Sequence, residues 1–124
     1  MAQHYADINV AENMKFVHTT LDDSKPGCPH FEVNAFENDE WVGNYQRRGD
    51  WIEQVFVAEN MRGRGICGKM LRHAKSKKKY LRLEVLANNN VAQHCYKKAK
   101  FKQHGKPYPS QWGDMVEMRW RSTT

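Results

Sequence analysis

A short stretch rich in glycine and arginine joins a strand-like segment to a helix-like segment in the middle of the chain. Residues 62–68 read Arg-Gly-Arg-Gly-Ile-Cys-Gly, the strand-like run 51–57 precedes them, and the helix-like run 69–72 follows. Such a turn gathers free backbone N–H groups at the positive end of a helix dipole. Glycine permits the sharp bend and lets phosphate oxygens approach the amides. The stretch therefore predicts a pyrophosphate-binding turn formed by Arg62, Gly63, Arg64, Gly65, Ile66, Cys67 and Gly68.

Glycine spacing of this kind also occurs in ordinary turns and in flexible basic loops. Two better-known phosphate motifs are absent from the sequence. No Gly-x-x-x-x-Gly-Lys-Ser/Thr is present, and no Gly-x-Gly-x-x-Gly is followed by an acidic residue about 20 positions later. Nucleotide hydrolysis and dinucleotide binding are therefore not expected.

The chain length and the cysteines limit the class of protein. With 124 residues, the sequence predicts one domain, residues 1–124, with a core of its own. The three cysteines, Cys28, Cys67 and Cys95, are scattered and odd in number, which predicts neither a disulfide framework nor a metal knuckle. Cys28 and His30 could begin a metal site only with His94 and Cys95, which an expected helix carries. No metal ligand is assigned.

Hydropathy and the N-terminal residues bear on the location of the protein. No window approaches the roughly 18 apolar residues that a membrane span needs. Residues 1–10 also lack a basic segment followed by an apolar one. We therefore expect a cytoplasmic protein without a membrane partner.

The net charge of +6 is unevenly distributed along the chain. Residues 1–54 hold ten acidic and four basic residues, whereas residues 55–124 hold four acidic and sixteen basic residues. The basic half suits a polyanion such as coenzyme A or a nucleic acid, and the acidic half suits a cation. Because an acidic half repels phosphates, a nucleic-acid partner is the less favoured expectation.

Hydrophobic periodicity predicts alternating strands and two helices. The expected strands cover residues 14–20, 31–36, 40–45, 51–57, 81–86, 101–104 and 115–121. Helices are expected to follow Gly65 and to start at Asn90, which is a good helix cap. The order strand, helix, strand predicts that 51–57 and 81–86 lie parallel. Pro107 and Pro109 are expected to break the chain, and residues before 30 have little pattern.

This order of elements resembles the GNAT superfamily of acetyl-CoA-dependent N-acetyltransferases over residues 30–121. The family's pyrophosphate motif, Gln/Arg-x-x-Gly-x-Gly/Ala, is matched by Arg62-x-x-Gly65-x-Cys67, with cysteine in the last position. A second motif, Asn90-x-Ala92-x-x-x-Tyr96, follows one strand later and ends in Lys100-Phe101 where the family has Gly-Phe. The resemblance implies an α/β (α+β) fold, with a mixed, mostly antiparallel twisted sheet, a parallel central pair and flanking helices.

Within the superfamily, residues 52–57 and 61–66 look like the corresponding stretches of spermidine/spermine acetyltransferases, in which the glutamate at Glu53 is a proposed base. The chain is short before the first motif, so the two helices that form one wall of the acceptor site in the family are expected to be truncated or absent. An open site, or a wall contributed by the second subunit of a homodimer, would follow.

The resemblance implies a binding or catalytic role for each candidate residue. Val55, Phe56 and Val57 would follow the pantetheine arm of acetyl-CoA, with the backbone N–H of Val55 at the thioester oxygen, and Asn90 belongs to the same set. Glu53, expected on the same strand face as Val55 and Val57, is the candidate base, acting through water. Tyr96 is the candidate acid for the leaving thiolate. The reaction requires no metal.

The acceptor is left open by the sequence. The acidic first half favours a polycation: a diamine or polyamine (putrescine, cadaverine, spermidine) first, a lysine side chain or N-terminus of a protein second, and an aminoglycoside third. Counter-charges could come from Asp39, Glu40, Asp50, Asp114 and Glu117, none of which stands out. A non-catalytic module that binds coenzyme A or nucleic acid is the alternative from another class.

Overall fold

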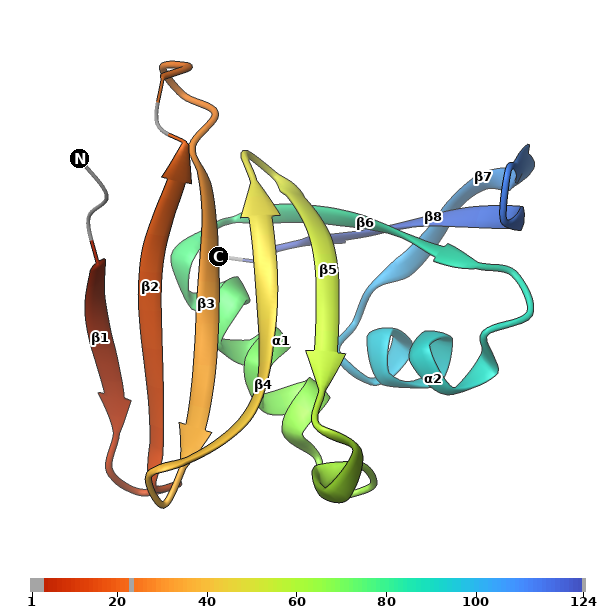
Figure 1. Ribbon diagram of the computed structural model, residues 1–124. Coiled ribbons are helices and arrows are strands. Elements are labelled where there is room, and N and C mark those ends of the chain that lie inside the picture. Colours follow the sequence, from red (N-terminus) through yellow and green to blue (C-terminus); the bar gives the residue numbers. More distant parts are fainter. Residues whose placement is uncertain (1–3, 23, 124) are drawn as a thin grey trace.

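The computed structural model describes residues 4–22 and 24–123 as one sheet with two main helices (Figure 1). The strands are β1 (His4–Asn9), β2 (Met14–Asp22), β3 (His30–Glu37), β4 (Glu40–Arg48), β5 (Trp51–Val57), β6 (Tyr80–Leu86), β7 (Lys102–Ser110) and β8 (Gly113–Arg121). The helices are the short 3-10 helix η1 (Glu59–Met61), α1 (Ile66–Lys77) and α2 (Asn90–Lys98).

The sheet has the order β1-β2-β3-β4-β5-β6-β8-β7, and every neighbouring pair is antiparallel except β5 and β6. These two strands are paired only at Trp51 with Arg82 and at Ile52 with Leu83, after which they separate. Figure 1 shows the separation, with β5 leaving the line of β6 and β8. The predicted mixed sheet with a parallel central pair is confirmed.

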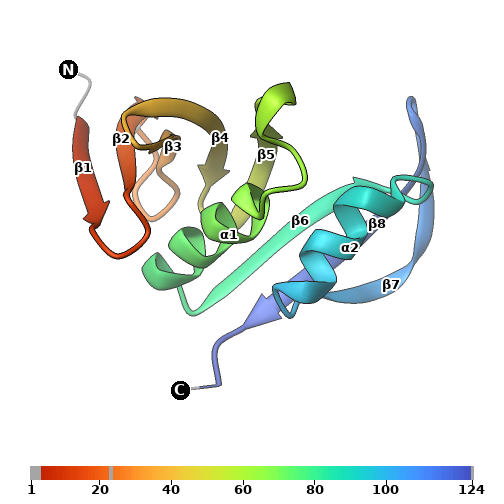
Figure 2. The same ribbon diagram turned by 90° about the horizontal axis from the view of Figure 1, so that it is seen from below.

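Both main helices pack on the same face of the sheet (Figure 2). Lys75 of α1 donates to the carbonyl of Ala99 just after α2, at 2.9 Å. The core beneath them is one continuous cluster, because the apolar stripe of α1 and the inward residues of alternating strands meet there. Its fully buried large members are Tyr45, Phe101, Met14, Ile66, Met70, Leu71, Leu81, Leu83, Met118, Val33 and Val42.

The N-terminal region carries strands in place of helices. Residues before 30 had too little pattern for more than one expected strand, and β1 was not predicted. It pairs antiparallel with β2 from His4 with Thr19 to Asn9 with Met14. Within the described residues 4–22 and 24–58 there is no helix. The expectation that two helices are missing here is confirmed, and no helix of the described chain covers the opposite face of the sheet.

Two predictions from the sequence are wrong: that Pro107 and Pro109 break the chain, and that Asn90 caps the second helix. Pro107 and Pro109 lie inside β7, which is an edge strand and so can tolerate residues without an N–H. The cap of α2 is Asn89, not Asn90, since the Asn89 side chain accepts from the N–H of Ala92 at 3.1 Å. By contrast, Lys100 has φ 73°, the left-handed conformation expected where the family has glycine.

Gly43 of β4 sits where β5 approaches most closely. It is paired with Val57, and a Cβ at this position would collide with the carbonyl oxygen of Phe56. Its next contacts would be Met70 Cε and Val57 Cα, each at 3.2 Å. The absence of a side chain therefore lets β4, β5 and α1 pack together.

We expect Gly43→Ala to lower the free energy of unfolding by about 1–3 kcal/mol, the usual cost of overpacking a closed core. Urea denaturation monitored by circular dichroism measures it. Gly68→Ala is the matched control: a Cβ there meets nothing within 4 Å, and α1 gains a better helix former. Equal midpoints for the two variants would contradict this account of Gly43.

No helix in residues 4–22 and 24–123 is long and apolar enough to cross a membrane.

Candidate active site

The separation of β5 from β6 opens a groove of about 1160 Å³ between β5, α1 and α2. Three parts of the chain line it: the end of β5, the turn into α1 together with residues of that helix as far as Lys75, and α2 with the residues at its two ends. Of the predicted residues, the groove lining contains Val55, Phe56, Val57, Arg62, Gly63, Gly65, Ile66, Cys67, Gly68 and Tyr96. The predicted stretch and the predicted tyrosine are therefore brought together.

The N-terminus of α1 opens into this groove without a side-chain cap. Its N-cap residue, Gly65, has φ 80° and ψ 11°, and Gly63 has φ 78°, both in the left-handed region that favours glycine. The N–H groups of the first helical turn have no partner within the helix. A Cβ at Gly63, Gly65 or Gly68 would meet nothing within 4 Å. The turn is an open cradle for an anionic group.

Basic side chains surround this cradle. The guanidinium of Arg62 donates to the carbonyl of Val57 at 3.2 Å and lies 5.9 Å from the centre of the Phe56 ring. Arg72 and Lys75 also line the groove, further along α1. Arg64 is outside the lining, and its guanidinium contacts the sulfur of Met61 at 3.6 Å. The positive charge and the helix dipole both favour a polyphosphate at this end.

Tyr96 belongs to α2 and lines the groove. Its side chain is buried, with 8% exposed, and its ring packs at 6.3 Å from that of Phe101. Burial raises the pKa of the Tyr96 phenol above its ordinary value. The hydroxyl therefore keeps its proton at neutral pH and can serve as a proton donor, not as a base.

Cys67 and Cys95 are joined by a disulfide bridge. The expectation that the cysteines form no disulfide framework is wrong for this pair. Cys67 lies in the first turn of α1 and Cys95 on the facing side of α2, so the packing of the two helices brings together residues that are 28 positions apart. Sequence spacing could not reveal this contact. The bridge connects the two helical walls of the groove.

Glu53 lies outside the groove lining because of a β-bulge. Gln46 is paired with Gln54 and Arg47 with Ile52, so Glu53 is the extra residue between them. The bulge breaks the two-residue alternation, and the expectation that Glu53 shares a face with Val55 and Val57 is wrong. Its carboxylate contacts the Arg48 guanidinium at 3.2 Å and His30 Nε2 at 3.3 Å.

Similarity to known proteins identifies the family of this chain. A family model described as an acetyltransferase (GNAT) domain matches residues 29–103, more than half of the chain. The chain belongs to the GNAT acetyltransferase family. It is accordingly an acyltransferase that uses acetyl-CoA as the acetyl donor. No curated protein matches the sequence.

Several solved structures share the fold of this GNAT domain. RimL, a ribosomal-protein acetyltransferase in complex with coenzyme A, matches with a TM-score of 0.68 at 11% identity, over 75% of this chain and 62% of that one. Spermidine N-acetyltransferase SpeG from Vibrio cholerae matches with 0.63 at 16% identity, over 79% and 68%. Ribosomal-protein-alanine N-acetyltransferase from Brucella melitensis matches with 0.59 at 24% identity, over 77% and 69%. These relatives act on different acceptors, so the likeness establishes the fold alone.

The cradle and groove of this GNAT domain fit coenzyme A. The open space at Gly63 and Gly65 can receive the pyrophosphate. The β5 segment 55–57, which leaves β6 beyond the pair Ile52 and Leu83, offers its backbone to a pantetheine arm. Asn90, predicted with this set, is outside the lining, whereas its neighbour Asn89 is inside it.

The sheet face without helices carries polar groups that sequence reasoning missed. Asn44 donates to Glu32 at 3.0 Å, and Gln54 donates to Asn44 at 3.4 Å. On β6, the Glu84 carboxylate accepts from the Tyr108 hydroxyl. Alternation along β3 and β6 places these glutamates outward, but no spacing distinguishes them from ordinary solvated charges.

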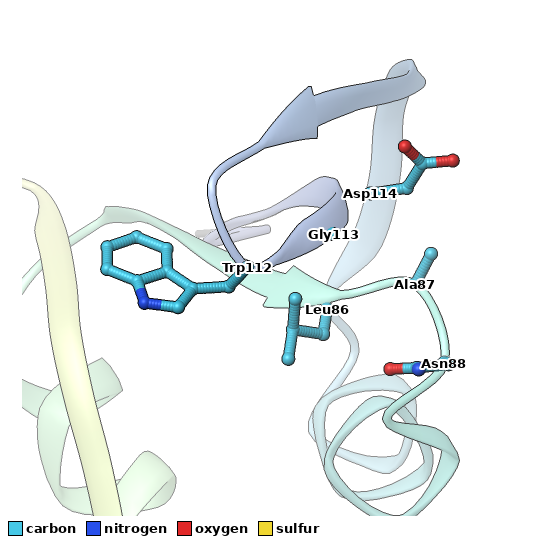
Figure 3. A pocket seen from close by; sticks show the side chains of 6 residues that line it. All are labelled: Leu86, Ala87, Asn88, Trp112, Gly113 and Asp114. Atoms are coloured by element: carbon cyan, nitrogen blue, oxygen red, sulfur yellow. The ribbon is translucent and has the colours of Figure 1, made fainter.

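Two of the carboxylates proposed from the sequence are held in ion pairs. Asp50 pairs with Lys78 at 2.8 Å, and Glu117 pairs with Arg119. Asp114 lines a separate pocket of about 340 Å³ at the ends of β6 and β8, together with Leu86 and Trp112 (Figure 3). Trp112, which lines this pocket, is mostly exposed.

Proposed function

We propose that this GNAT domain transfers the acetyl group of acetyl-CoA to a primary amine of a small polycation, a diamine or polyamine such as putrescine, cadaverine or spermidine. The observation that carries the proposal is the position of Glu53. It sits in a bulge immediately after Ile52, the last β5 residue that is paired with β6. A carboxylate is thus held where the strands separate, beside a sheet face that no described helix covers.

Proton removal is the first chemical requirement. An aliphatic amine with an ordinary pKa near 10.4 is neutral in roughly one molecule in a thousand or fewer at pH 7. Glu53 is the proposed base and acts through water. The neighbouring His30 and Arg48 contact its carboxylate and hold it in place.

Acyl transfer then needs a polarised thioester and a protonated leaving group. The proposed donor to the thioester oxygen is the backbone N–H of Val55, on the strand segment that borders the groove. Tyr96 is the proposed acid for the departing coenzyme A thiolate, because its buried phenol is protonated and lines the same groove.

A polycationic acceptor is supported by charge and by one relative. The face without helices presents Glu32 and Glu84. A solved spermidine N-acetyltransferase shares the fold. A lysine side chain or N-terminus of a protein is the second candidate acceptor, favoured by the open face, which leaves room for a peptide.

A nucleic-acid module is disfavoured by the ion pairs of two lysines at the C-terminal end of α1. Lys77 pairs with Asp7 and Lys78 with Asp50, each at 2.8 Å. These cations are therefore neutralised within the fold and are not free for phosphates.

We also propose a cytoplasmic homodimer. β1 and β7 are the two outer strands of the open sheet and offer pairing edges, and a second subunit could supply the missing wall of the acceptor site.

Thiol release from acetyl-CoA tests the acceptor. The purified protein is assayed with putrescine, cadaverine, spermidine, spermine, a lysine-rich peptide and an aminoglycoside. We expect release with the diamines or polyamines. Release only with the peptide would move the assignment to protein acetylation, and no release with any amine despite coenzyme A binding would reject the proposal.

We expect Glu53→Gln to lower kcat/KM for the amine about 100-fold and to alter the acidic limb of the pH–rate profile, because the amide cannot accept the proton. Initial rates from pH 5 to 10 measure it. Asp39→Asn is the matched control, since Asp39 is exposed in the turn between β3 and β4, at the opposite end of β4 from Arg48. An unchanged acidic limb would remove Glu53 from the role of base.

A further inference from the structure

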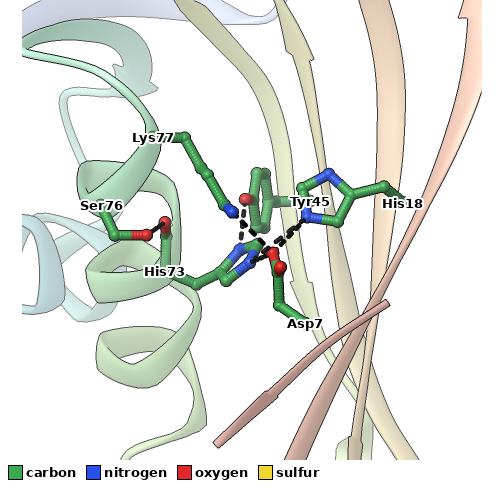
Figure 4. A network of polar contacts seen from close by, with 6 residues as sticks. All are labelled: Asp7, His18, Tyr45, His73, Ser76 and Lys77. Atoms are coloured by element: carbon green, nitrogen blue, oxygen red, sulfur yellow. Dashed lines mark hydrogen bonds and ion pairs between the residues drawn. The ribbon is translucent and has the colours of Figure 1, made fainter. Parts of the chain in front are cut away.

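A second cluster of titratable side chains lies away from the acetyl-CoA groove. It joins Asp7 of β1, His18 of β2 and His73 of α1, on the face of the sheet that α1 covers (Figure 4). His18 and His73 are 2% and 9% exposed, whereas the Asp7 side chain is partly exposed. None of the three lines the groove, and nothing in the acetyl transfer uses them.

The ligand-type atoms of the three residues converge on one point. Nε2 of His18 is 3.3 Å from Nε2 of His73. The Asp7 Oδ2 atom is 3.0 Å from the first nitrogen and 2.8 Å from the second. Ligands about 2.0–2.1 Å from a tetrahedral zinc ion lie about 3.3 Å from one another. The triangle therefore needs only a small expansion to hold an ion.

Packing fixes the two imidazoles in this orientation. The Tyr5 ring stacks on His18 and the Phe16 ring on His73, each with a centroid distance of 4.1 Å. The other nitrogen of His73, Nδ1, is 2.7 Å from the Tyr45 hydroxyl. In the tautomer in which Nδ1 donates to Tyr45, the Nε2 lone pair points into the triangle. Histidine ligands of metals are commonly oriented by such a partner.

We propose that Asp7, His18 and His73 bind a divalent transition-metal ion, with Zn²⁺ as the preferred ion, through one carboxylate oxygen and two Nε2 atoms. Two imidazoles and one carboxylate suit zinc, which takes nitrogen and oxygen ligands in a four-coordinate site. Because the Asp7 side chain is partly exposed, the proposed fourth ligand is a water.

Lys77 competes with the proposed metal ion for the carboxylate of Asp7. Its ammonium is 2.8 Å from the same Asp7 oxygen, so in the metal-free protein this lysine supplies the positive charge that the carboxylate needs. The lysine side chain is long and one-third exposed, and it can move into solvent when an ion binds. Zinc affinity is therefore set by competition with Lys77.

The site would have a structural role. Asp7 is its only ligand from β1, which is an outer strand, while His18 and His73 belong to the body of the fold. A bound ion would fasten β1 to α1 across the sheet edge. Zinc is then expected to raise the melting temperature, because it binds the folded chain only.

The test is calorimetric titration of Zn²⁺ into chelator-treated protein, with Co²⁺ as a spectroscopic probe. We expect one Zn²⁺ per chain, a rise in Tm, and visible Co²⁺ bands of nitrogen and oxygen ligation. In NMR spectra, the Nε2 signals of His18 and His73 should shift on Zn²⁺ addition. A thiolate charge-transfer band would assign the ion to the cysteines and overturn the proposal.

Variants distinguish a metal-binding site from a polar cluster that binds no metal. Asp7→Asn, at the partly exposed ligand, should raise the Zn²⁺ Kd at least about tenfold, and Lys77→Met should lower it about tenfold by removing the competing charge. His104→Ala is the control, because this exposed histidine of β7 is far along the sheet and should leave the Kd unchanged. No zinc binding by the wild type, or equal Kd values for wild type and Asp7→Asn, would overturn the proposal.

Discussion

Gly68→Asp is expected to abolish coenzyme A binding while leaving the fold at least as stable. Gly68 is the third residue of α1, lines the groove at its phosphate end, and has open space around the position of a Cβ. An aspartate there favours the helix, through the dipole and through the loss of a glycine. The same carboxylate repels a polyphosphate, and two like charges about 4 Å apart cost about 4 kcal/mol near a protein surface. The coenzyme A Kd should therefore rise at least about 100-fold.

Gly68→Ala is the control that distinguishes the effect of the added charge on coenzyme A affinity from the effect of the added size. The alanine adds only a methyl group to the open space, so the Kd should stay within about threefold of wild type while the helix gains up to about 1 kcal/mol. Calorimetric titration with coenzyme A and thermal denaturation measure both quantities. Equal affinities for Gly68→Asp and Gly68→Ala would place the phosphates elsewhere.

Tyr96→Phe is expected to lower kcat about 100-fold and to leave the KM for acetyl-CoA within about twofold. The substitution removes the proposed proton donor but keeps the ring that packs against Phe101. Burial raises the pKa of this phenol, so the wild-type kcat should not fall on the alkaline side until the pH exceeds 10. Thiol release at saturating amine, measured from pH 6 to 11, gives both results.

Tyr80→Phe is the matched control for the loss of a phenol. Tyr80 begins β6 and packs under the guanidinium of Arg121, outside the groove lining. Its replacement should leave kcat unchanged. An unchanged kcat in Tyr96→Phe as well would remove Tyr96 from the role of acid and leave it as a core residue.

Much of the fold could be predicted because its signals are local. The strand-like run 51–57 placed β5 at its observed bounds, and the glycine turn before Ile66 placed the start of α1. The two motifs that carry the family resemblance flank β6, and the parallel pair followed from the connection between them. β1 escaped prediction because His4–Asn9 has no clear two-residue alternation and is held as a strand by its pairing with β2.

The part of the candidate site that could be predicted is the part whose residues all come from one continuous segment. The cradle is a single turn, so its residues appear together in the sequence. The bulge at Glu53 was not predictable, because it depends on how β5 registers with β4. The Cys67–Cys95 bridge and the cluster of Asp7, His18 and His73 depend on contacts between residues far apart in the chain. No periodicity encodes such contacts.

The most direct test of coenzyme A binding at the cradle is to titrate ¹⁵N-labelled protein with acetyl-CoA and follow the backbone amide signals. We expect the largest shifts at Ile66, Cys67 and Gly68, in the first turn of α1, with further shifts along 55–57 and at Tyr96. Shifts confined to the lysines at the C-terminal end of α1, or no shifts at saturating acetyl-CoA, would contradict binding at the cradle.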